Sequence, residues 1–76
     1  MTDTTKTLID GIATKLALQS KAVKKWVKFN NYSVDQLVCI NRQIANNEIY
    51  LPTLVSAIIN NSKYRISIYQ EKKCPQ

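Results

Sequence analysis

The chain has 76 residues, 45% of them hydrophobic, and a formal net charge of +6 from 11 basic and 5 acidic side chains. This length allows one small domain, and the charge favours a polyanionic partner: nucleic acid first, an acidic protein or membrane surface second. There is no histidine, the carboxylates are scattered, and the single glycine, Gly11, excludes a glycine-rich phosphate loop. We therefore expect no enzyme activity, no cofactor, no metal and no small-molecule substrate.

The N-terminal part of the chain predicts a leader followed by a first helix. Residues 1–7 are polar, unlike a signal peptide, so we expect a flexible leader or a fraying first turn of a helix. We also expect a cytoplasmic protein with both cysteines, Cys39 and Cys74, as free thiols. No apolar run approaches the ~20 residues that cross a bilayer, and we expect no membrane association. Asp10 is placed to cap a helix. Its apolar positions, at helical spacing, are Ile12, Ala13 and Leu16.

The apolar stripe of this helix is interrupted and then resumes. Gln19 and Ser20 occupy positions where a continuing stripe would need hydrophobic residues. The interruption predicts two short helices joined by a tight turn, with Ser20 capping the second. The new stripe, in which we expect Trp26 to be a core residue, consists of Ala22, Val23, Trp26 and Val27.

The second half of the chain predicts two more helices and a strand. Residues 29–32 form a loop by composition, and Ser33 caps a helix with apolar periodicity to Ile44. Pro52 suits the first turn of a helix that ends at Ile59. Residues 63–69 alternate, which predicts a strand that needs a partner, and residues 70–76 form a disordered tail. We expect a mainly α, small helix-turn-helix bundle of four to five helices with a C-terminal strand, over residues 8–69.

Basic residues cluster around the interrupted stripe. Five of the 11 basic side chains lie within one short segment, and no acid occurs between Asp10 and Asp35. These five are Lys15, Lys21, Lys24, Lys25 and Lys28. Such a run on a helix can also be a merely solvated face. If four to six lysines neutralise phosphates, a plot of the logarithm of the binding constant against the logarithm of the salt concentration should have a slope of roughly −4 to −5.

Residues 12–26 resemble the helix-turn-helix of small phage regulators, the Cro-type (Cro/C1-like) repressors and their bacterial relatives. The residues that match in order and spacing are Ile12, Ala13, Leu16, Leu18, Ala22, Val23 and Trp26. The resemblance covers roughly residues 8–59. Two features depart from it: Ala17 replaces the turn glycine, where a left-handed backbone would cost about 1 kcal/mol, and only residues 1–9 remain for the usual first helix.

The resemblance implies a sequence-specific DNA-binding transcription regulator, a phage-type repressor, whose helix over residues 20–28 enters the major groove of double-stranded DNA. Residues near the N-terminus of that helix would meet base edges, and the others would contact the backbone. The candidate DNA-binding residues are Thr14, Lys15, Gln19, Ser20, Lys21, Lys24, Lys25, Lys28, Asn30 and Asn31. The protein would be nucleoid-associated, or lie in the host cytoplasm if a phage encodes it.

We also expect a homodimer, because small modules of this kind gain affinity by pairing on a two-fold site. The strand over residues 64–69 is the candidate pairing element, with Ile58 and Ile59 adding apolar area.

Two alternatives remain at the sequence level. The basic helix could bind an acidic protein partner, as an inhibitor would, which the missing turn glycine and short first helix would suit. Residues 8–29 could instead form one continuous amphipathic helix on a membrane surface, although Gln19 and Ser20 interrupt its stripe.

Overall fold

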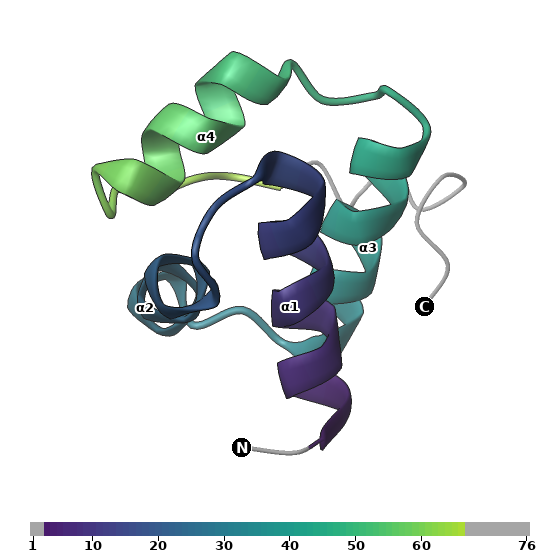
Figure 1. Cartoon of the computed structure of the whole chain (residues 1–76), viewed down its shortest axis with the longest axis vertical. Helices are drawn as coiled ribbons and strands as arrows, with labels where there is room; N and C mark the ends of the chain where they lie inside the picture. Colours follow the sequence, from purple (N-terminus) through teal and green to yellow (C-terminus); the bar gives the residue numbers. More distant parts are fainter. Residues whose placement is uncertain (1–2, 67–76) are drawn as a thin grey trace.

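The computed structural model describes residues 3–66, which form four helices around one core (Figure 1). The helices are α1 (Asp3–Leu16), α2 (Ser20–Asn30), α3 (Val34–Ala45) and α4 (Leu51–Ile59). α1 and α3 pack side by side, while α2 crosses them and appears nearly end-on in Figure 1. α4 packs against α2. The expected mainly helical bundle is confirmed.

The first helix begins earlier than the sequence predicted. α1 starts at Asp3, so of the two expectations for residues 3–7 the flexible leader is wrong and the helical turn agrees with the structure; Asp10 does not cap the helix. The polar side chains of this segment occupy the exposed surface of a helix whose buried stripe continues through Ile9 and Ile12. Asp3 in the first turn also interacts favourably with the helix dipole. Residues 1 and 2 lie outside the described part of the chain.

All four helices end in the same backbone motif. After α1, the Ala17 N–H donates to the Thr14 carbonyl oxygen at 3.3 Å and the Leu18 N–H donates to the Ala13 carbonyl oxygen at 2.8 Å. This pair of bonds is the Schellman motif, which requires a left-handed residue after the helix. The left-handed residues are Ala17, Asn31, Asn47 and Asn61, with φ of 56°, 57°, 57° and 51°.

Three of these residues are the second member of an asparagine pair, and asparagine tolerates this backbone better than most residues. The asparagine pairs therefore fix where three of the helices end. The end of the remaining helix, α1, depends on Ala17, which takes the left-handed conformation although it has a Cβ atom, unlike glycine.

Replacing Ala17 by glycine should stabilise the domain. Ala17 is exposed, so the substitution removes no packing, and it relieves the strain of a Cβ in the left-handed region. We expect the free energy of unfolding to increase by about 1 kcal/mol, which raises the melting temperature by about 4–8 °C in a domain of this size. Thermal denaturation followed by circular dichroism measures this. The matched control is Ala45→Gly, an exposed helical position at which the same change should destabilise; a lower melting temperature for Ala17→Gly would contradict the assignment.

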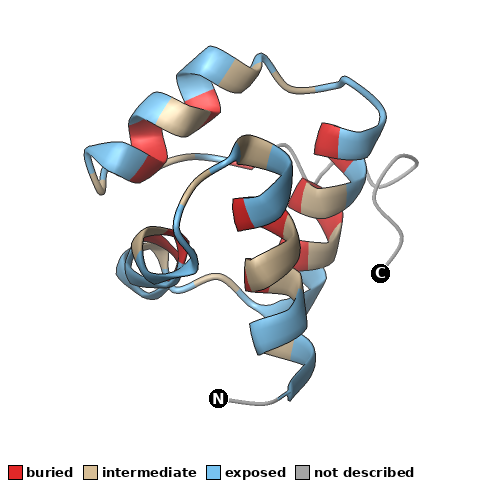
Figure 2. Cartoon of the chain, viewed as in Figure 1, coloured by how far each residue is buried: buried red, intermediate tan, exposed pale blue. Residues whose placement is uncertain are grey.

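Trp26 lies at the centre of the core. Its side chain is 0% exposed, and its Nε1 donates to the Ser62 carbonyl oxygen at 2.9 Å. The rings of Tyr32 and Tyr64 pack on it with centroids 5.1 and 5.9 Å away. Figure 2 shows that the buried positions face inward on all four helices. The predicted core role of Trp26 is confirmed.

The α1–α3 contact depends on Gly11 and Asn41. A Cβ built on Gly11 would lie 3.0 Å from the Asn41 Oδ1 atom, so the glycine permits the close approach. The Asn41 Nδ2 group donates to the carbonyl oxygens of Leu8 at 3.2 Å and Leu37 at 3.0 Å, which ties the two helices together.

The C-terminal strand is wrong where the structure describes it. Residues 63–66 form no strand; Ile66 is buried in the core, and the Tyr64 N–H donates to Asn30 Oδ1 at 3.0 Å instead of to a neighbouring strand. Residues 67–69 of the predicted strand and the tail over residues 70–76 lie outside the described residues. Ile58 is also buried, so it cannot contribute to a pairing surface, whereas Ile59 is 63% exposed.

The expected free thiol at position 39 is also wrong. Cys39 is 1% exposed and disulfide-bonded. Its place on the apolar stripe of α3 indicated core packing, but periodicity carries no information about a covalent partner. Cys74 lies outside the described residues. Among residues 3–66, no helix has the length and apolar character needed to cross a membrane.

Candidate nucleic-acid interface

The position of α2 depends on the turn after α1. Residues 17–19 connect the two helices, and at the left-handed Ala17 the chain turns so that α2 crosses α1 (Figure 1). The predicted tight turn is confirmed, and one continuous helix over residues 8–29 is wrong. Val23, Trp26 and Val27 bury one face of α2. This leaves the opposite face of the helix toward solvent.

That solvent face carries a row of four lysines. Lys21, Lys24, Lys25 and Lys28 are all exposed and follow one another at spacings that place them on one side of the helix. We call them the α2 lysine row. α2 contains no acidic residue, and within residues 3–66 the single ion pair joins Lys6 and Asp10 at 3.3 Å. The charge of the row is therefore uncompensated by any ion pair in the described part of the chain.

The α2 lysine row destabilises the folded chain. It contains four like-charged pairs three or four residues apart, and each such pair disfavours a helix by roughly 0.2–0.5 kcal/mol. No ion pair of the row within the described residues offsets this repulsion. An external polyanion would relieve it.

At the N-terminus of α2, Gln19 and Ser20 differ in their partners. Gln19 is exposed and its side chain makes no capping hydrogen bond. The Ser20 hydroxyl donates to the Asp10 carboxylate, and this bond, with a second from Lys6, holds the pKa of Asp10 below its ordinary value. Ser20 is the first residue of α2 and not its cap, so the predicted Ser20 cap is wrong. Ser20 instead connects the start of α2 to α1, while the amide of Gln19 remains available to a ligand.

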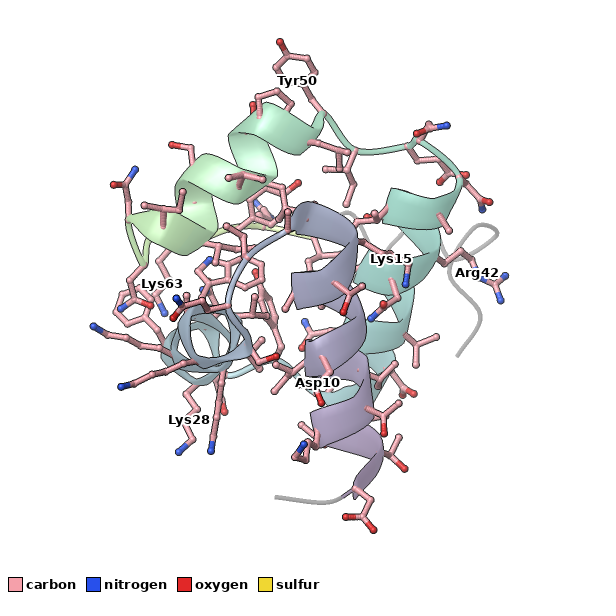
Figure 3. All side chains as sticks on the ribbon, in the orientation of Figure 1. Asp10, Lys15, Lys28, Arg42, Tyr50 and Lys63 are labelled. Atoms are coloured by element: carbon pink, nitrogen blue, oxygen red, sulfur yellow. The ribbon has the colours of Figure 1, made fainter. Side chains whose placement is uncertain are left out.

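Two acids lie beside this end of the row. A hollow of about 250 Å³ between α1 and α2 is lined by Asp3, Asp10, Lys21 and Lys24, among others. Figure 3 shows Asp10 on the side of α1 that faces α2. Lys6, which is ion-paired with Asp10, lines the same hollow, so Asp3 is the acid that most directly offsets the charge of Lys21 and Lys24.

The remaining sequence candidates lie elsewhere or have structural partners. Thr14 is exposed on α1, and the Lys15 Nζ donates to Asn41 Oδ1 at 3.0 Å, over α3 and away from α2 (Figure 3). The Asn30 Nδ2 donates to the carbonyl oxygens of Trp26 at 3.0 Å and Ser62 at 3.2 Å. Asn31 is exposed at the left-handed end of α2. The structure thus brings together Gln19, Ser20 and the α2 lysine row.

One basic residue near α2 had no sequence signal. The Lys63 Nζ donates to the Phe29 carbonyl oxygen at 3.2 Å and lies 4.7 Å from the Phe29 ring centroid. It comes from the segment after α4, so nothing in the local sequence pattern links it to α2. Arg42, in contrast, lies on α3, on the opposite side of the molecule (Figure 3).

Comparison of the chain with protein-family models, curated proteins and solved structures found no significant match. The function is therefore inferred from the site itself.

Proposed function

We propose that this protein is a sequence-specific DNA-binding regulator that places α2 in the major groove of double-stranded DNA. The observation that supports this most directly is the α2 lysine row, four exposed ammonium groups without ion pairs opposite the buried face of the same helix. Phosphates are the anions that a linear row of this kind can neutralise together. The resemblance of residues 12–26 to Cro-type repressors supports the same function.

The dimensions of α2 suit a groove. Eleven residues give a helix about 16 Å long, and the major groove, about 12 Å wide, admits one α-helix. α2 lies at the edge of the bundle, with one side free of other helices (Figure 1). Gln19 and Lys21, near its N-terminus, are the residues that we assign to base edges, because glutamine can pair with adenine and lysine with guanine. Lys24, Lys25 and Lys28 then contact phosphates.

A salt titration tests the proposal. Binding of the full chain to a fluorescein-labelled 20-base-pair duplex of random sequence, followed by anisotropy, should weaken with salt with a slope of about −2.7 or steeper if Lys24, Lys25 and Lys28 contact phosphate. Absence of binding at low salt would overturn the proposal and favour an acidic protein as the partner. Selection of bound duplexes from a random pool then identifies the preferred site.

Single substitutions should separate base reading from phosphate contact. Gln19→Ala and Lys21→Ala should weaken binding to the selected site more than binding to random duplex. Lys28→Gln should weaken both about equally and reduce the slope by about one unit. Arg42→Gln, the same charge change on the opposite side of the molecule, is the control and should leave the slope unchanged. Equal effects of the first three substitutions on both duplexes would contradict the base-reading assignment.

The dimer remains part of this proposal, with exposed residues of α4 as its candidate surface; one of them, Ile59, was also expected from the sequence. Ile59 is 63% exposed and Tyr50 is 75% exposed, at opposite ends of α4. Sedimentation at micromolar concentration should show a dimer, and a clean monomer would remove this part of the proposal.

A further inference from the structure

The segment after α4 is held against the C-terminal end of α2 by several hydrogen bonds. Both Trp26 Nε1 and Asn30 Nδ2 donate to the Ser62 carbonyl oxygen, at 2.9 and 3.2 Å. The Tyr64 N–H donates to Asn30 Oδ1 at 3.0 Å, and the Tyr32 hydroxyl donates to the Tyr64 carbonyl oxygen. Lys63 lies between these two anchored residues, so its backbone position relative to α2 is fixed.

The Lys63 side chain is exposed and directed along the last turn of α2. Its Nζ contacts the Phe29 carbonyl oxygen, next in sequence to Lys28, the last residue of the α2 lysine row. Figure 3 shows Lys63 and Lys28 on the same side of the molecule. An ammonium group has three donors, and Phe29 uses one of them. The others remain available to an acceptor outside the protein.

We propose that Lys63 is a fifth cation of the DNA-contacting surface and binds the phosphate backbone at the C-terminal end of α2. This inference rests on the proposed function and adds a second chain segment to its surface. The end of α2 at Lys28 lies about 13 Å along the helix from Gln19, so Lys63 contacts backbone and not the bases that Gln19 meets. Asp3 lies beside Lys21 and Lys24, at the other end of the row, so Lys63 adds its charge at the end that is away from this carboxylate.

A purely structural role for Lys63 makes a different prediction. A lysine near the C-terminus of a helix can stabilise its last carbonyl groups and its dipole. Loss of that role would lower the melting temperature, but it would not alter the number of counterions released when DNA binds. The salt slope of binding therefore distinguishes the two roles.

The test compares Lys63→Gln with the wild-type chain on the random 20-base-pair duplex. The slope should become less negative by about 0.9, the value for one phosphate contact, while Lys63→Arg retains the wild-type slope and Arg42→Gln does not change it. Substitution of an exposed lysine should leave the chain folded, which circular dichroism checks. An unchanged slope for Lys63→Gln, with wild-type binding intact, overturns the inference alone. Absence of salt-dependent binding by the wild-type chain overturns the proposed function and this inference together.

Discussion

Trp26→Ala should unfold the domain at room temperature. The side chain is fully buried, and truncation of such an aromatic residue costs roughly 3–5 kcal/mol. The total stability of a small domain is at the low end of about 5–15 kcal/mol. The substitution also removes the donor to the Ser62 carbonyl oxygen and the surface on which Tyr32 and Tyr64 pack. The segment after α4, which holds Lys63, should then lose its contacts with α2.

Far-ultraviolet circular dichroism and urea denaturation measure this effect, with Trp26→Phe as the matched control. Phenylalanine retains much of the apolar volume but cannot donate to Ser62, so it isolates a hydrogen bond worth about 1 kcal/mol together with a smaller packing loss. We expect Trp26→Phe to remain folded with a lower urea midpoint. A folded Trp26→Ala variant with nearly wild-type stability would contradict the central position of this residue.

Replacing all four lysines of the α2 lysine row by glutamine should abolish DNA binding while making the domain more stable. The phosphate contacts of Lys24, Lys25 and Lys28, at about 0.9 each, account for about −2.7 of the salt slope, and this contribution should disappear. At the same time the variant relieves four like-charged pairs, which together disfavour the helix by about 1–2 kcal/mol at low ionic strength. Glutamine is a good helix former, so α2 should remain intact.

The matched control replaces the same four lysines by arginine, which keeps the charge and should keep the salt slope. Anisotropy with the random duplex and thermal denaturation in low and high salt give the two measurements. The stability difference between wild type and the glutamine variant should decrease in high salt, because the repulsion is screened. Wild-type binding by the glutamine variant would place the DNA contact on another surface, and a lower melting temperature would give the row a structural role.

Periodicity predicted the second, third and fourth helices close to their observed bounds, because their buried stripes are nearly uninterrupted. The same reasoning failed at the start of α1, where residues 3–7 are polar and resemble a leader although they form the exposed first turns of a helix. It failed again at residues 63–66, whose alternation is satisfied by packing Tyr64 and Ile66 on the core. An alternating pattern indicates which side chains turn inward, but it does not indicate which groups form hydrogen bonds with the backbone of the segment.

The amino-acid sequence alone determined the helical class, the interruption after Leu16, the central place of Trp26 and the clustering of lysines on α2. These properties depend on residue spacing within one helix or on burial of the largest apolar side chain. Only the tertiary structure decided that Ala17 accepts the left-handed turn, that the Lys15 ammonium contacts Asn41, and that Lys63 lies against the end of α2. Contacts between residues 26 to 34 positions apart depend on how the helices pack, and no local pattern records that packing.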